Sequence, residues 1–350
     1  MDGIGLVLAG GGGKGIYQVG ILKAFAEAGL LNDVVAISGS SIGSVNGALF
    51  AEGKAESNIV DSVKQMEEVW NKIDYNVFFN MNGPQPGIGD SHFSRKATTQ
   101  LIEEYISYDR FASDPDILPV VCTVAKCPPY VNSTDKVNEE EFKLITSAST
   151  EETYRYYTAE YMPLKGRSKA DIIRTILATT ALPVIYAPVP INGGLYIDGG
   201  VKDNVPIKPL YDMGIRKFYV IELSETSAIK GVHSSKASVL TGVPDFPDAE
   251  IVDIIPSKDL GKLLSGTMNF DWEDKAFKLH LGELDGKRYI KTLIEKDEAY
   301  IAIADQLAEL DYNRAVQKKY FDRTYNTLSS NINSRFDYIN KIEEQFKGDF

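Results

Sequence analysis

The sequence predicts an α/β protein with a mainly parallel sheet and a helical C-terminal extension. Its 350 residues are 43% hydrophobic and 25% charged, which supplies enough apolar material for the core of one large domain. Strand and helix patterns alternate over residues 3–51, an order typical of parallel βαβ units. Beyond residue 287 the pattern is mostly helical and polar.

The first four elements carry the prediction of a parallel sheet. A buried strand is predicted at residues 3–8, and the glycines that follow end it. A helix pattern covers residues 16–28. The apolar run at 34–37 has the length of a central strand, and a second helix pattern covers 44–51.

The later elements continue this alternation before the chain changes character. We expect one domain over residues 1–225, a connecting segment over 226–286 that completes it, and a helical extension over 287–350. The further elements are predicted as helices at 59–73 and 170–179, strands at 117–124 and 218–223, a hairpin within 142–162 and a loop at 224–248.

The C-terminal extension carries a stripe of apolar residues at helical spacing, which we expect to pack on the protein's own core. Dimerisation or membrane contact through this stripe is left open. The stripe consists of Phe321, Tyr325, Leu328, Ile332, Phe336, Ile339 and Phe346.

Charge and composition exclude several classes of protein. Lys and Arg total 37 against 49 Asp and Glu, so the net charge is −12, which argues against nucleic-acid binding and against general adsorption to anionic membranes. No stretch approaches the roughly 18 consecutive apolar residues of a membrane-spanning helix. The start of the chain lacks the basic region of a signal peptide, and two cysteines, Cys122 and Cys127, suggest a reducing compartment. We therefore expect a cytoplasmic protein, and export without a signal peptide is left open.

A glycine-rich turn from Gly10 to Gly15 follows the first strand. Gly10, Gly12 and Gly15 satisfy the dinucleotide fingerprint, but the acidic residue that would hold the ribose is missing after the second strand. A phosphate-binding P-loop fails because Lys14 is followed by Gly15 instead of Ser or Thr. An oxyanion hole of backbone N–H groups and a tight turn without function both stay open.

A second motif, Gly39-Ser-Ser-Ile-Gly43, is the G-x-S-x-G nucleophile elbow in its required setting, after a strand and before a helix. The sharp turn would expose the Ser41 hydroxyl, and the helix N-terminus would stabilise negative charge near it. The alternative for Ser41 is a helix N-cap, which does not require glycines on both sides.

A serine nucleophile needs a base. His233 lies in a serine-rich loop and His280 in a polar helical stretch, so each is better explained as a surface residue. Asp198 ends an apolar strand and precedes Gly199 and Gly200, which places a carboxylate where ligand sites gather in open parallel sheets.

Together the three motifs resemble the patatin-like phospholipase family over residues 3–225. The glycine loop Gly10 to Gly15, the elbow Gly39 to Gly43 and the Asp198 to Gly200 element occur in the family's order. The stretch at 178–183 resembles the family's small-residue segment before the Asp-Gly-Gly element, and the stretch at 203–206 resembles the segment after it.

The resemblance implies a three-layer α/β/α fold and a serine acyl hydrolase that cleaves lipid esters with neither metal nor cofactor. By it, Ser41 is the nucleophile and Asp198 its direct partner, a dyad without histidine. The oxyanion donors would be the N–H groups of Gly11, Gly12 and Gly13, and Lys14 would position the loop or pair with a phosphate.

Three functional hypotheses follow. The first is hydrolysis of phospholipid or lysophospholipid esters, the second a nucleotide-binding oxidoreductase that uses the glycine loop, and the third an inactive lipid-binding protein. The expected partner is a lipid or fatty-acyl ester, and peripheral membrane contact is left open. Apolar residues within 77–93 could line an acyl groove or cover the site, and Lys165, Arg167 and Lys169 could meet phosphate head groups or form a solvated face.

Overall fold

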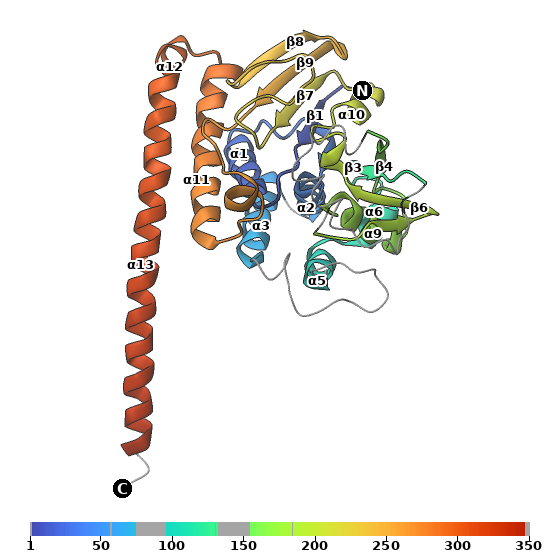
Figure 1. Cartoon of the computed structure of the whole chain (residues 1–350). Helices are drawn as coiled ribbons and strands as arrows, with labels where there is room; N and C mark the ends of the chain where they lie inside the picture. Colours follow the sequence, from blue (N-terminus) through green and yellow to red (C-terminus); the bar gives the residue numbers. More distant parts are fainter. Residues whose placement is uncertain are drawn as a thin grey trace.

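The computed structural model is shown in Figure 1. It describes residues 2–56, 58–74, 96–129, 131, 155–183 and 185–346. The strands are β1 (Ile4–Leu8), β2 (Val34–Ser40), β3 (Val120–Lys126), β4 (Thr158–Pro163), β5 (Val189–Ile191), β6 (Gly194–Asp198), β7 (Lys217–Ile221), β8 (Ser238–Val243) and β9 (Phe246–Ile254). The α-helices are α1 (Ile16–Glu27), α2 (Ile42–Glu56), α3 (Ile59–Lys72), α5 (Lys96–Tyr105), α6 (Tyr108–Ser113), α9 (Lys169–Thr179), α10 (Lys208–Asp212), α11 (Trp272–Tyr289), α12 (Glu298–Ala302) and α13 (Ala304–Phe346). Short 3₁₀ or π turns are η1 (Gly12–Gly15), η2 (Gly199–Val201), η3 (Leu263–Thr267) and η4 (Ile290–Ile294).

The strands of the described residues form one mixed sheet in the order β5-β6-β3-β2-β1-β7-β9-β8, with β4 also paired to β3. The central strands β3, β2, β1, β7 and β9 run parallel to one another. Antiparallel pairs complete the sheet at both ends. At one end β4 and β6 pair with β3, and β5 pairs with β6, and at the other end β8 pairs with β9. The predicted mainly parallel sheet is therefore confirmed.

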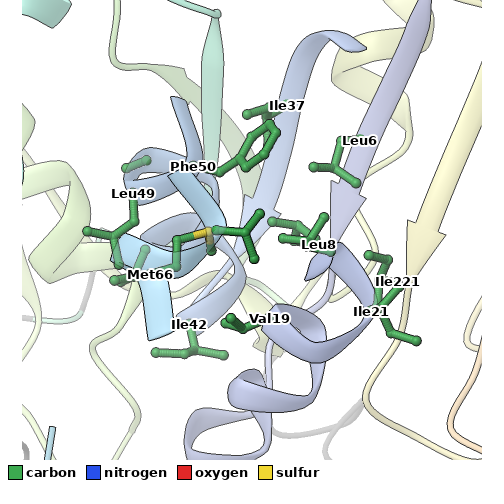
Figure 2. Close-up of a cluster of buried hydrophobic side chains, with 14 of the residues drawn as sticks. Leu6, Leu8, Val19, Ile21, Ile37, Ile42, Leu49, Phe50, Met66 and Ile221 are labelled. Atoms are coloured by element: carbon green, nitrogen blue, oxygen red, sulfur yellow. The ribbon is translucent and has the colours of Figure 1, made fainter. Parts of the chain in front are cut away.

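Alternate side chains of the central strands enter two cores, as the period of a strand requires. Leu6 and Leu8 of β1 and Ile37 of β2 pack against α1, α2, α3 and α11 on one face, and Figure 2 shows part of this cluster. Val7 of β1 points to the other face, where Leu210 of the short helix α10 covers it. The three-layer α/β/α class is confirmed, with one thick and one thin outer layer.

Helix α1 is buried on two sides because α11 packs over it from the outside. A Cβ at Gly20 would collide with the carbonyl oxygen of Leu279, and a Cβ at Gly282 with that of Tyr17. The buried hydroxyl of Tyr17 donates to Asp285 of α11 at 2.8 Å. The C-terminal part of the chain thus completes the helical layer that covers the sheet.

The predicted loop at 224–248 is wrong in its second half, where β8 and β9 form a hairpin. The strand pattern was hidden by residues that usually mark turns, namely Gly242, Pro244 and Pro247. Pro247 is tolerated because β9 pairs with β7 only from Glu250 onward, so its missing N–H costs no bond to that strand. Residues 226–286 therefore include two strands of the same sheet, and the division into three segments stays a prediction.

The predicted hairpin within 142–162 is described only at its end, where β4 pairs with β3. Most of that range, and the apolar residues at 77–93, lie outside the described residues. Lys165 donates to the carbonyl oxygen of Pro115 at 2.6 Å, and the Lys169 ammonium lies 4.9 Å from the ring centroid of Tyr108, so these two cations of the predicted basic cluster have protein contacts.

The prediction that the C-terminal stripe packs on the core is wrong for its described members. Phe321, Tyr325 and Leu328 are 68%, 63% and 56% exposed. Helix α13 continues past the end of its neighbour α11 and leaves the body of the protein (Figure 1), so no core is available there. Among the described residues, no helix is both long and apolar enough to cross a bilayer.

Candidate active site

Ser41 occupies the sharp turn between β2 and α2. Its φ of 51° lies in the left-handed region that non-glycine residues seldom adopt, which marks a strained elbow. The elbow presses on β1, because a Cβ at Gly43 would collide with the carbonyl oxygen of Leu8. Helix α2 begins at Ile42, so the positive end of its dipole lies beside the serine.

Asp198 ends β6 and faces Ser41. The Ser41 hydroxyl donates to Asp198 Oδ2 at 2.6 Å. The other oxygen, Oδ1, accepts the N–H of Gly200 at 2.8 Å, so both carboxylate oxygens have defined donors. Asp198 is 3% exposed, and its position is fixed by its own N–H, which donates to the carbonyl oxygen of Ala181 at 2.9 Å.

The two residues meet because β3 changes partner between two adjacent positions. Ser40 pairs with Thr123, and Asp198 pairs with the next residue, Val124. Because β4 pairs along the whole of this stretch, β2 and the antiparallel β6 share the opposite flank of β3 and end facing each other. The sequence predicts Asp198 at the end of a strand in a parallel sheet, whereas β6, the strand that it ends, runs antiparallel to both of its partners, β3 and β5.

The glycine loop forms one wall of the site. Gly10, Gly11 and Gly12 line the same cavity as Ser41, and Gly12 has a φ of 54° that favours glycine. Gly13 is not among the residues that line this cavity, and a Cβ on it would collide with the carbonyl oxygen of Asn269.

The other motif residues support these positions. Gly15, Gly39, Gly199 and Gly200 pack so closely on neighbouring atoms that a Cβ at any of them would collide. Lys14 is half-buried outside the cavity lining. Burial lowers the pKa of its ammonium group, and the carboxylates of Asp259 and Glu225 oppose this shift.

The cavity has a volume of about 360 Å³ and its wall is largely apolar beyond the polar centre. Such a lining suits an acyl chain better than a nucleotide. The apolar side chains come from α2, from the segment after α9, from η2 and from the segment around η3, and they are Ile42, Leu182, Tyr186, Val201, Met268 and Phe270.

Two polar residues, Thr179 and Asn204, hold the site together, although the sequence indicated no role for either. The Ser41 N–H donates to Thr179 Oγ1 at 3.0 Å, and that hydroxyl donates to the carbonyl oxygen of Thr123 at 2.6 Å. Asn204 Nδ2 donates to the carbonyl oxygen of Gly10 at 3.2 Å. Thr179 lies in the stretch 178–183 and Asn204 in the stretch 203–206, both of which resemble segments of the family. Their place in these stretches is the sequence feature that could have indicated a role.

Residues 267–270 also contribute to the site, and no feature of the sequence indicated this. A Cβ at Gly12 would collide with the carbonyl oxygen of Thr267. Thr267 and Asn269 thus set carbonyl oxygens against the loop where a pyrophosphate would need donors, which removes the support for the dinucleotide hypothesis.

Neither described histidine reaches the cavity. His233 is exposed in the loop before β8, and His280 lies on α11 outside the cavity lining, with its pKa lowered mainly by burial. The structure therefore brings together Ser41, Asp198 and the start of the glycine loop, and leaves both histidines outside.

Comparisons with known proteins find relatives among the lysophospholipases and the patatin-like phospholipases. A lysophospholipase NTE1 of Cryptococcus neoformans is 27% identical over 222 residues, which are 63% of this chain and 11% of that protein. Patatin-like phospholipase domain-containing protein 7 of Rattus norvegicus is 51% identical over 67 residues, 19% of this chain and 5% of that protein. The chain thus spans a small share of the length of these curated relatives.

Among solved structures, VipD from Legionella pneumophila matches with a TM-score of 0.43 and 14% identity, over 83% of this chain and 67% of that one. The family model for patatin-like phospholipase matches residues 6–211, more than half of the chain and the span that carries all three motifs. The chain therefore belongs to the patatin-like phospholipase family, which its motifs resembled.

Proposed function

We propose that this chain hydrolyses the carboxylic ester bonds of phospholipids or lysophospholipids with Ser41 as nucleophile and Asp198 as base. The observation that carries the proposal is the 2.6 Å contact between Ser41 Oγ and Asp198 Oδ2 at the wall of an apolar cavity. The relative named as a lysophospholipase supports the lysophospholipid as a substrate.

In the first step Ser41 Oγ attacks the ester carbonyl carbon while its proton passes to Asp198. The tetrahedral oxyanion would be held by the N–H groups of Gly11 and Gly12, which line the cavity beside the serine, with Gly13 as a third proposed donor. When the tetrahedral intermediate collapses, the alcohol leaves with the proton from Asp198. The acyl group stays bound to Ser41 as an acyl-enzyme.

In the second step Asp198 takes a proton from water, which attacks the acyl carbon of the acyl-enzyme. The bond between this carbon and Ser41 Oγ then breaks, Ser41 Oγ takes the proton back from Asp198, and the fatty acid leaves. Leu182, Tyr186 and Phe270 offer an apolar wall for the acyl chain. The strained backbone at Ser41 keeps the hydroxyl in place before substrate arrives, which reduces the entropy cost of reaching the transition state.

The test is covalent labelling combined with product analysis. A fluorophosphonate probe should label the wild-type chain on Ser41 and not label Ser41→Ala, and mass spectrometry should find free fatty acid after incubation with lysophosphatidylcholine. A folded chain that neither takes the label nor releases fatty acid would favour the inactive lipid-binding hypothesis instead.

We also propose that the site reaches its substrate at a lipid surface through the segment around η3. Leu263 and Leu264 are 57% and 75% exposed, and Trp272 is 43% exposed, while the same segment lines the cavity through Met268 and Phe270. Exposed apolar side chains next to the cavity fit a surface from which a lipid enters.

Vesicle sedimentation with the inactive Ser41→Ala chain tests this contact without interference from hydrolysis. Leu263→Asp with Leu264→Asp should abolish sedimentation with phosphatidylcholine vesicles. Met213→Asp is the control, since Met213 is 37% exposed and lies outside the cavity lining. Equal sedimentation of all the variants would remove the proposed surface and leave the proposed chemistry intact.

A further inference from the structure

Helix α13 is far longer than the helix it packs on. Its 43 residues span about 65 Å at 1.5 Å per residue. Near its start the ring of Tyr312 contacts that of Phe277 on α11, with centroids 6.0 Å apart, and Asp311 forms a buried ion pair with Arg288. Arg323 reaches Glu273, in the first turn of α11, at 3.6 Å. The part of α13 that follows Arg323 therefore extends past the N-terminal end of α11 (Figure 1).

A heptad pattern begins where α13 passes the N-terminal end of α11. From residue 321 to residue 346 the spacing alternates between four and three residues, which is the repeat of 3.5 that produces a left-handed coiled coil. The d and a positions in order are Phe321, Tyr325, Leu328, Ile332, Arg335, Ile339, Ile342 and Phe346, with one charged residue among them. The b and c positions opposite are polar, namely Asn326, Thr327, Asn333, Ser334, Asn340 and Lys341.

The described part of this seam is exposed and faces away from the protein's own body. Phe321, Tyr325 and Leu328 are each more than half exposed, whereas Ala315, one of the residues that face α11, is fully buried. At 3.6 residues per turn, Leu328 lies about 140° around the helix from Ala315. A continuation of the contact with α11 could therefore not cover the seam.

We propose that residues 321–346 form a parallel two-stranded coiled coil with the same segment of a second copy of this chain. Eight seam positions at about 100 Å² each supply about 800 Å² per helix, the contribution of one partner to a stable interface. Leu328 at d followed by Ile332 at a favours two strands, whereas Ile339 at a followed by Ile342 at d would by itself favour three or four.

A second copy fits the segment better than a membrane does. Helices that lie on a bilayer carry Lys and Arg on their polar face. Residues 321–346 instead hold three basic residues and four acidic ones, and the chain as a whole has a net charge of −12. The acidic residues of the segment are Asp322, Asp337, Glu343 and Glu344, and the basic ones are Arg323, Arg335 and Lys341.

The flanking positions favour the parallel orientation. Full antiparallel overlap would set Asp322 of one helix against Glu343 of the other, two like charges. Parallel pairing sets Thr324 near Ser329 and Tyr338 near Glu343, so the flanking positions hold no like-charged pair. Arg335 would then meet its own copy at a d position, a polar layer that fixes the register and costs stability.

Size-exclusion chromatography of the whole chain with light-scattering detection tests the proposed dimer. The wild type should show twice the mass of one 38.6 kDa chain, and Tyr325→Asp with Leu328→Asp should show the mass of one chain. Tyr320→Asp is the matched control, because Tyr320 is 62% exposed, neighbours Phe321 and lies off the seam, so this variant should stay dimeric.

Two outcomes would overturn the proposal. One is a single-chain mass for the wild type across a dilution series, and if vesicle sedimentation then depended on Tyr325 and Leu328, a membrane would be the partner. The other is dissociation of Tyr320→Asp to the same extent as the seam variant, since the seam would then have no special role.

Oxidation tests the orientation. Leu328→Cys should form a disulfide-linked dimer, because d positions face each other only in a parallel, in-register pair, and Tyr320→Cys should not. The native Cys122 and Cys127 are buried and do not interfere. A dimeric Leu328→Cys chain that forms no such link would overturn the parallel arrangement.

Replacement of the charged layer gives a test in the opposite direction. Arg335→Leu should lower the dimer dissociation constant by about tenfold or more, since two like charges leave the seam. An unchanged or raised dissociation constant would contradict the assigned register.

Discussion

Two buried carboxylate sites at strand ends of the same sheet have opposite characters. Asp198, at the end of β6, receives the Ser41 hydroxyl and the Gly200 N–H and lines the cavity. Glu222, just after β7, lies against Asp253 of β9, and neither lines that cavity. Both carboxylates accept hydrogen bonds, but Glu222 also faces a second acid, whereas Asp198 faces the hydroxyl of Ser41.

The partners decide what each carboxylate can do. Burial and the nearby Asp253 raise the pKa of Glu222 to about 8, although the Ala228 N–H and the Ser227 hydroxyl oppose the shift, and burial also raises the pKa of Asp253. The acid pair therefore retains a proton at neutral pH and serves packing. A buried carboxylate becomes a candidate base only where donors hold it beside a nucleophile and a cavity.

The largest effect should come from the first site. Asp198→Asn and Ser41→Ala should each lower kcat for p-nitrophenyl butyrate by at least about 10³-fold, because they remove the proposed base or the proposed nucleophile. Asp253→Asn should keep kcat near the wild-type value. Steady-state kinetics on chains with matching circular dichroism spectra decides this, and a severe loss in Asp253→Asn alone would reverse the two roles.

A smaller loss is expected when the elbow loses its support. Thr179→Val removes the acceptor of the Ser41 N–H and should lower kcat by about 10- to 100-fold with little change in KM, because the nucleophile would shift. The control is Thr175→Val one turn earlier on α9, where the hydroxyl has only a weak contact with Met162 Sδ at 3.9 Å. Equal losses in both variants would indicate a packing effect of α9.

The acid pair should control stability as a function of pH. Because the pKa of Glu222 is higher in the folded than in the unfolded chain, its stabilising contribution is complete below the unfolded pKa near 4.3 and is lost as the pH rises through about 8. The free energy of unfolding should fall by up to about 1.4 kcal/mol per pH unit within that window.

Urea titrations from pH 5 to about 8 test this slope. Glu222→Gln should flatten it, whereas Glu225→Gln, at an exposed position three residues away, should leave it unchanged. An identical slope in wild type and Glu222→Gln would show that the pair binds no extra proton on folding.

The smallest effect is expected at the histidines. His233→Ala and His280→Ala should each keep kcat within about twofold, because neither side chain reaches the cavity and a dyad needs no third group. A loss above about 10²-fold in either variant would require a triad and a different base.

The sequence by itself located the residues of the candidate site and their local setting. The glycine loop, the elbow and the Asp198 element could be found because tight turns and exposed nucleophiles restrict residue type locally, through positive φ and the absence of room for a Cβ. The parallel core strands were likewise predictable from short apolar runs between helices.

Tertiary structure decided how these pieces meet. Ser41 and Asp198 touch because β3 exchanges one partner strand for another at Thr123, and residues 267–270 close the glycine loop from far along the chain. The exposed seam of α13 was predicted wrongly for the same reason. Whether an apolar stretch is buried depends on which distant element covers it, and local spacing carries no information about that.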